Sequence, residues 1–214
     1  MNHWQFLEVF PMKFVVFDLG GVMVKIRRTW QEVCDGVGLI WPPDAPDIQR
    51  EIFNLYHRYH ADEFSVSELA SKLSLLTEQR FSPEQCLMAH RGILVGEYTG
   101  INQLIDELHH RGTQTAVLSN TCADHWAILK TYPSVASIHR HFTSFELKVS
   151  KPDPKIYQKV KSELGVAPHE LLFFDDSAEN IQAAKTCGWN GEVITSEGEP
   201  HQQLRKYLET YEIL

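Results

Sequence analysis

The chain has 214 residues, of which 43% are hydrophobic and 22% are charged. With roughly 150 residues per domain as a guide, this length predicts one core domain and a modest second unit. The formal net charge is -8 and the sequence pI is near 5.7, which argues against nucleic acid and anionic membrane surfaces as partners. No apolar run reaches the roughly 20 residues that a membrane helix needs.

The sequence has neither a secretory signal nor a pattern of paired cysteines. Residues 1–11 lack the basic start and the small-residue cleavage site of a signal peptide. The four cysteines are far apart and form no CxxC pair, which argues against a disulfide scaffold and a thiolate zinc site. We therefore expect a protein of the reducing cytoplasm whose cysteines are buried thiols: Cys34, Cys86, Cys122 and Cys187.

Short apolar runs that end in polar residues predict the strands of a parallel sheet. The run KFVVF is rich in β-forming residues and stops at Asp18, as a strand buried on both faces does. Helical patterns separate the runs, and this alternation predicts an α/β fold with a Rossmann-like, doubly wound parallel sheet. The expected strands are residues 13–17, 113–118, 141–145, 171–174 and the weaker 192–195, and the expected helices are residues 100–111, 154–164 and 178–187.

Residues 29–95 break this rhythm, because they contain several amphipathic helical patterns and no clear strand. Ser65 and Glu68 form a capping-box pattern at the start of one of these helices. We therefore predict a helical cap over residues 29–95, inserted into a Rossmann-like core of residues 12–28 and 96–214. The helices expected in the cap are residues 30–37, 47–60, 66–76 and 83–90.

Polar side chains follow the predicted strands at the points where the strands end. Ligands of doubly wound sheets bind beyond the carboxyl ends of the strands, so we expect these side chains to meet at one rim. Clustered carboxylates repel one another unless a cation lies between them, and oxygen-only ligands suit Mg²⁺. Such an ion offsets the charge of a phosphate group, so that an anionic carboxylate can attack phosphorus. The residues expected at this rim are Asp18, Ser119, Asn120, Lys151, Asp175 and Asp176.

Four segments resemble, in order, the four motifs of the haloacid dehalogenase-like (HAD) hydrolase superfamily. The resemblance covers nearly the whole chain from Lys13, and the helical insertion lies where the type-one cap of that family is inserted. The second and fourth motifs are also similar to those of bacterial sugar-phosphate phosphatases of the α-glucose-1-phosphate type. The segments are Phe17-Asp18-Leu19-Gly20-Gly21-Val22, Leu118-Ser119-Asn120-Thr121, Lys151-Pro152, and Phe174-Asp175-Asp176 with Asn180.

The resemblance implies a magnesium site at the first and fourth motifs. Asp18 is expected to be both the nucleophile and a metal ligand, and the backbone carbonyl of Gly20 a second ligand. Asp176 is expected to bind the metal directly, and Asp175 to support it directly or through water. A carboxylate that attacks phosphorus forms an aspartyl-phosphate, so the implied reaction passes through a covalent intermediate at Asp18.

The second and third motifs imply the contacts to the substrate. Ser119 and Lys151 are expected to hold the phosphate, and Asn120 to contact the substrate or to brace its loop. Asn180 is expected to be a structural brace. The implied activity is Mg²⁺-dependent hydrolysis of a small phosphorylated metabolite, with a sugar phosphate as the first expectation, by a monomer or a homodimer.

Gly20 is the one departure from the family pattern that bears on catalysis. Family phosphatases usually have a second aspartate at this position, which protonates the leaving group and then activates water. Glycine keeps the backbone carbonyl but cannot transfer a proton, and the loss of a general acid–base costs about 10²- to 10⁴-fold in rate. Three explanations stay open: a leaving group that needs no proton, such as that of an acyl phosphate; a proton from the cap at His57, His60 or Glu63; or weak catalysis.

Three other functions are compatible with a glycine at this position. Haloacid dehalogenases expel halide without an acid, but they use no Mg²⁺ and lack the acidic pair that is present here as Asp175-Asp176. Phosphonate hydrolases need a cap lysine for a Schiff base, and Lys72 is the only lysine between Thr29 and Val95. The third alternative is a catalytically weak member that acts as a binding or regulatory protein.

Overall fold

A parallel five-stranded sheet forms the centre of the computed structural model, which describes residues 12–41, 48–60, 63–195 and 197–214. The strand order is β5-β4-β1-β6-β7, and every pair of neighbours is parallel. This arrangement confirms the predicted Rossmann-like α/β fold. The strands are β1 (Phe14–Phe17), β4 (Gln114–Ser119), β5 (Arg140–Thr143), β6 (Leu171–Asp175) and β7 (Asn190–Val193).

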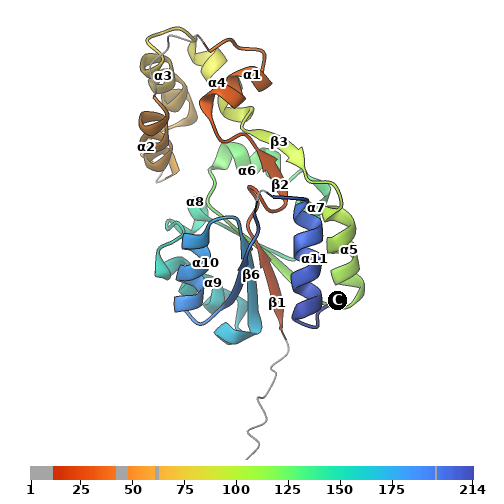
Figure 1. Cartoon of the computed structure of the whole chain (residues 1–214). Helices are drawn as coiled ribbons and strands as arrows, with labels where there is room; N and C mark the ends of the chain where they lie inside the picture. Colours follow the sequence, from red (N-terminus) through yellow and green to blue (C-terminus); the bar gives the residue numbers. More distant parts are fainter. Residues whose placement is uncertain (1–11, 42–47, 61–62, 196) are drawn as a thin grey trace, which may run out of the picture.

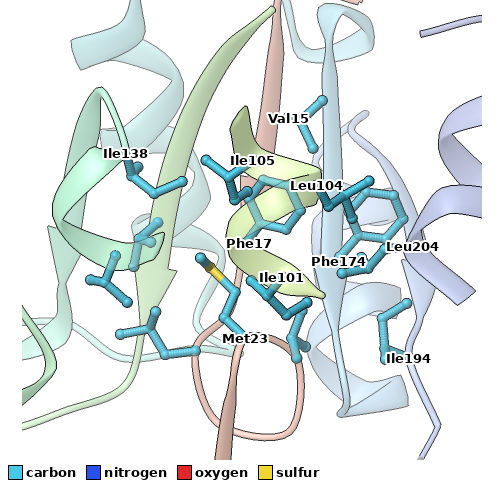
Figure 2. Packing of buried hydrophobic residues seen from close by; sticks show 14 of the residues in the cluster. Val15, Phe17, Met23, Ile101, Leu104, Ile105, Ile138, Phe174, Ile194 and Leu204 are labelled. Atoms are coloured by element: carbon cyan, nitrogen blue, oxygen red, sulfur yellow. The ribbon is translucent and has the colours of Figure 1, made fainter. Parts of the chain in front are cut away.

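Alternate residues of the central strands pack into two hydrophobic layers, one on each face of the sheet. Phe17 and Phe174 point to the face covered by α5 (Ile101–His110) and α11 (Pro200–Thr210), where their rings stack with centroids 5.8 Å apart. Figure 2 shows this layer from close by. Val16 and Phe173 point to the opposite face, against α9 (Pro154–Leu164) and α10 (Ala178–Thr186). The period of two in the strands therefore produces the two buried faces of a doubly wound sheet.

Shorter elements connect the strands and helices of the sheet. They are α6 (Ala123–Leu129), α7 (Pro133–Ser137), α8 (Ser144–Leu147) and a 3₁₀ helix, η1 (Pro168–Glu170). Within the described part of the chain, no helix has the length and apolar character that are needed to cross a membrane.

The strand register brings the ends of three strands to one edge of the sheet. Phe17 pairs with Val117 of β4 and with Phe174 of β6, so Asp18 follows β1 at the level where Asp175 ends β6. The backbone N–H of Asp18 donates to the carbonyl of Phe174 over 2.8 Å, which extends this pairing by one residue. The expected meeting of polar side chains at the carboxyl edge is therefore present in the fold.

Four helices form a separate layer beyond this edge of the sheet, as Figure 1 shows. They are α1 (Trp30–Gly36), α2 (Gln49–His60), α3 (Val66–Leu76) and α4 (Pro83–Arg91), and they share a hydrophobic core of their own. Capping boxes at Thr29, Ser65 and Ser82 start α1, α3 and α4. These helices all lie within the predicted cap of residues 29–95; the division into two domains stays a prediction.

A two-stranded ribbon connects the helical layer to the sheet. In it β2 (Val24–Ile26) runs antiparallel to β3 (Leu94–Glu97). Neither strand was predicted, because each is only three or four residues long and is stabilised by a partner about 70 positions away rather than by a local pattern.

Three further expectations differ in detail from the structure. The last strand is residues 190–193 rather than 192–195, since its pairing with β6 begins at Asn190. The strand expected at 141–145 begins and ends earlier, at Arg140 and Thr143. Cys187 is half-exposed rather than buried, because it follows the last turn of α10 at the surface; the other three cysteines are buried as expected. The expected start of α2 at residue 47 lies outside the described residues.

Candidate active site

A buried lysine joins two of the predicted carboxylates at the carboxyl edge of the sheet. Lys151 Nζ donates to Asp18 Oδ1 over 2.8 Å and to Asp175 Oδ2 over 2.6 Å, and its third hydrogen bond reaches the carbonyl of Leu118 over 2.9 Å. Lys151 is 4% exposed, Asp18 8% and Asp175 0%. The first, second and fourth motifs thus converge on the ammonium group of the third, all of whose N–H donors are used.

Asp175 is held in place by further partners in addition to Lys151. Asn180 Nδ2 donates to both carboxylate oxygens over 3.0 and 3.1 Å, and the backbone N–H of Ser177 donates to Oδ1 over 2.8 Å. Ser177 is also the N-cap of α10, so the start of this helix fixes both the carboxylate and the amide that orients it. Asn180 thus has the bracing contacts that we expected of it.

Asn120 makes a reciprocal pair of hydrogen bonds with the backbone of Lys151. Its Nδ2 donates to the Lys151 carbonyl over 2.8 Å, and its Oδ1 accepts from the Lys151 N–H over 2.9 Å. Of the two roles that were open for Asn120, these contacts favour the brace. The second motif therefore positions the lysine of the third motif through a side chain.

Asp176 completes a group of three carboxylates. One oxygen from each of Asp18, Asp175 and Asp176 lies within 4.8 Å of the other two. Asp176 is ion-paired with Arg28, which follows β2 and precedes α1. Three carboxylates at this spacing repel one another, and Lys151 and Arg28 offset part of that repulsion.

The donor set of this acidic group fits a hard divalent cation. Carboxylate oxygens are the ligands that Mg²⁺ prefers, and two of the three carboxylates are less than a tenth exposed. Gly20 lies in the tight turn after Asp18, where the N–H of Gly21 donates to the carbonyl of Val24 over 2.8 Å. The role of the Gly20 carbonyl as a metal ligand stays a prediction.

Burial and charge have opposite effects on the ionisable groups of the site. Burial raises the pKa of Asp18 to about 6, against the lowering effect of the Lys151 ammonium. Burial lowers the pKa of Lys151, but the attraction of Asp18 and Asp175 outweighs it, so that this pKa is raised overall. Lys151 is therefore cationic and Asp18 is mostly ionised at neutral pH, and a further cation nearby would lower the pKa of Asp18.

A cavity of about 210 Å³ opens beside this group, between the loops of the sheet and the helical layer. Gly20, Ser119 and Asn120 line it on the side of the sheet, and Tyr56 and His60 of α2 line it on the other side. The remaining lining residues are Leu19, Val24, Ile26, Ile93, Leu94, Thr121, His125 and Leu129.

Of the three proton sources that we considered in the cap, only His60 lines this cavity. His57 is exposed and packs edge-on against Phe53, with ring centroids 4.5 Å apart. Glu63 is exposed and paired with Arg58 over 2.7 Å. The two histidines lie three residues apart on one helix, and their different depths were not evident from sequence.

Arg28 and two buried histidines, His90 and His125, were not predicted from the sequence. Arg28 has no motif of its own, and only the path of β2 brings it to Asp176. His90, Cys122 and His125 also bring possible ligand atoms within 4.8 Å of one another. However, the rings of His90 and His125 stack 4.1 Å apart at an angle of 12°, so their in-plane lone pairs lie in two separate, nearly parallel planes and cannot both point at one ion.

Comparisons with known proteins place these features in a family. A family model described as haloacid dehalogenase-like hydrolase matches residues 12–188. The chain is 25% identical over 206 residues to (S)-2-haloacid dehalogenase 4A of Burkholderia cepacia, with 88% of this chain and 85% of the relative covered. It is 25% identical over 198 residues to phosphatase MT3486 of Mycobacterium tuberculosis (strain CDC 1551 / Oshkosh), with 86% and 88% covered.

A solved structure agrees with the fold. The magnesium complex of a HAD family enzyme from Bacteroides thetaiotaomicron superposes with a TM-score of 0.76 at 23% identity, covering 92% of this chain and all of that one. The same enzyme has also been solved with magnesium and inorganic phosphate, with a TM-score of 0.73 at 22% identity and coverage of 88% and 97%. The specific similarity to glucose-1-phosphate phosphatases stays a prediction. The family match spans most of the sequence, and the chain belongs to the haloacid dehalogenase-like hydrolases.

Proposed function

We propose that this hydrolase is a Mg²⁺-dependent phosphatase that acts on a small phosphorylated metabolite through an aspartyl-phosphate at Asp18. One observation carries the proposal: oxygens of Asp18, Asp175 and Asp176 lie within 4.8 Å of one another beside a fully bonded lysine. The magnesium and phosphate complexes of the HAD family enzyme from Bacteroides thetaiotaomicron support it by analogy.

The residues of this chain divide the chemistry among them. Asp18 supplies the carboxylate oxygen that attacks phosphorus, and the bond from phosphorus to the leaving oxygen breaks as the new one forms. Lys151 orients Asp18 and offsets negative charge, and Ser119 lies in the cavity wall to hold a phosphoryl oxygen. Bound at Asp18, Asp175 and Asp176, Mg²⁺ would supply the positive charge that keeps Asp18 ionised and offsets the phosphate charge.

The acidic group favours this function over dehalogenation, although relatives of both kinds match the chain equally well. Displacement of a halide needs one carboxylate nucleophile and no cation site. Asp176, at 20% side-chain exposure, adds a third negative charge that such a reaction would not use. A divalent cation would use three carboxylates as ligands and offset their mutual repulsion.

Because Gly20 cannot donate a proton, the kinds of leaving group that the protein can release are restricted. His60 lines the cavity, but burial lowers its pKa to about 4, so at neutral pH it carries no readily transferable proton. A leaving group of low basicity needs none. The expectation of a sugar phosphate, the cytoplasmic location and the monomeric or dimeric state stay predictions.

Phosphate release is the first expected outcome. Purified protein should release phosphate from p-nitrophenyl phosphate in Mg²⁺, and EDTA should stop it. Asp18→Asn should lower kcat by about 10³-fold or more, because the nucleophile is lost. Chloride release from (S)-2-chloropropionate in EDTA, without phosphate release, would contradict the proposal and support a dehalogenase.

Arg28→Gln should tighten Mg²⁺ binding, because the guanidinium competes with the metal for Asp176. An exposed ion pair contributes about 0.2–1 kcal/mol, which converts to a gain of roughly 1.4- to 5-fold in affinity. Titration calorimetry with Mg²⁺ measures this without turnover. Lys25→Gln is the matched control, since Lys25 is an exposed neighbouring cation on β2. An equal change in both variants would mean that net charge alone is responsible.

Gly20→Asp tests whether the lack of a general acid at this position limits the rate of hydrolysis. A Cβ at Gly20 would lie 3.0 Å from Ile26 Cδ1, so we would combine it with Ile26→Val. The double variant should raise hydrolysis of an alkyl phosphate by up to about 10²-fold, and that of p-nitrophenyl phosphate much less. Ile26→Val alone is the control. Equal gains on both substrates would argue against a role in leaving-group protonation.

A further inference from the structure

We infer that the organic part of the substrate, which carries the leaving oxygen, is small, mostly apolar and without a charge of its own, as in an aryl or acyl phosphate with no second anionic group. The inference rests on the proposed function and names its substrate class. It comes from the cavity that begins at Gly20 and Ser119 and extends to α2, because the leaving group points away from the attacking carboxylate in an in-line displacement.

Most of the wall of this cavity is hydrocarbon. At about 210 Å³ it is smaller than the 300–1,000 Å³ of drug-sized sites, so it admits one small ring or a short chain. The aliphatic lining residues come from the turn after β1, from both strands of the ribbon, from the residue before β3 and from α6. They are Leu19, Val24, Ile26, Ile93, Leu94 and Leu129.

Half of the polar side chains of the wall are committed to other partners. The Tyr56 hydroxyl is 3.1 Å from His90 Nδ1, and His125 Nε2 donates to the His90 carbonyl over 2.9 Å. Asn120 uses both ends of its amide on the backbone of Lys151. A sugar, which needs a partner for each hydroxyl, would find few here.

None of the described residues that line the cavity is charged at neutral pH. Burial lowers the pKa of His60 to about 4 and lowers that of His125 as well, so both imidazoles are neutral. The residues outside the described part of the chain contain no lysine or arginine in the sequence. They therefore offer no lysine or arginine as a counterion for an anionic leaving group.

The nearby arginines are engaged elsewhere. Arg27 donates to the carbonyl of Gly92, Arg28 is ion-paired with Asp176, Arg58 is paired with Glu63, and Arg91 makes two hydrogen bonds to Asp124 over 3.0 and 2.8 Å. A carboxylate or a second phosphate in this cavity would be buried among methyl groups without a counterion. Such burial is strongly unfavourable, whereas a neutral apolar group gains by it.

The test compares two substrates that differ in one group. We would measure kcat/KM with Mg²⁺ for 4-carbamoylphenyl phosphate and 4-carboxyphenyl phosphate, which have the same shape. The carboxylate should lower kcat/KM by about 10²-fold or more. Glucose 1-phosphate should also be a poorer substrate than phenyl phosphate.

A charge placed in the wall should reverse this preference. Leu94→Lys adds an ammonium to the cavity, and we expect it to raise kcat/KM for the carboxylate by about 10-fold and to lower it for the amide. Val95→Lys is the matched control, because Val95 is the next residue of β3, is 42% exposed and does not line the cavity.

The outcomes separate the two proposals. Comparable kcat/KM for the two aryl phosphates in the wild-type protein would overturn this inference and leave the phosphatase proposal standing. If no phosphate ester or acyl phosphate is hydrolysed in a manner that depends on Asp18, the proposed function fails and this inference fails with it. If Leu94→Lys does not fold, the comparison of the two aryl phosphates with the wild-type protein is sufficient to test the inference.

Discussion

The site depends on one buried ammonium group between two carboxylates. Asp18 and Asp175 end neighbouring strands, so the parallel register brings two negative charges together in a region that excludes water. Lys151 donates to both, over 2.8 and 2.6 Å, and without it the pair would repel strongly. Removal of one partner from such a buried group leaves the others uncompensated, which is more costly than the loss of an exposed pair.

The rest of the fold serves to hold that lysine and its partners. Asn120 fixes the Lys151 backbone, and Asn180 and Ser177 fix Asp175 from the start of α10. These three residues come from loops and helix ends that the two hydrophobic layers of the sheet keep in register. The ribbon of β2 and β3 connects the helical layer to the same edge of the sheet, and the cavity lies between the two.

Sequence reasoning found the residues whose neighbours along the chain carry a pattern. Asp18 and Asp175 each end an apolar run, so their place at the carboxyl edge followed from strand periodicity. The pairing of Arg28 with Asp176 did not follow, and the choice between the two roles of Asn120 stayed open, because both depend on partners more than 30 residues away. His60 and His57 were equivalent in sequence, and only the orientation of α2 separates the inner one from the exposed one.

Gly20 and the apolar cavity are consistent with one another in the proposed reaction. A leaving group that needs no protonation is one whose charge is already delocalised, as in an aryl or acyl group, and such groups suit a hydrocarbon wall with a neutral imidazole. A basic sugar alkoxide would require both a proton donor and polar partners. The absence of an aspartate at Gly20 and the chemistry of the cavity thus favour the same class of substrate.

Phosphorylation of Asp18 can be detected by acid quenching during turnover, followed by mass spectrometry of the peptide that contains Asp18. If Asp18 is the nucleophile, this peptide should gain the mass of one phosphoryl group in the presence of Mg²⁺ and substrate. Hydroxylamine should remove the added group, and Asp18→Asn should never acquire it. Turnover without any labelled Asp18, or an alkyl ester on Asp18 after incubation with a 2-haloacid, would rule out the phosphatase mechanism proposed for this protein.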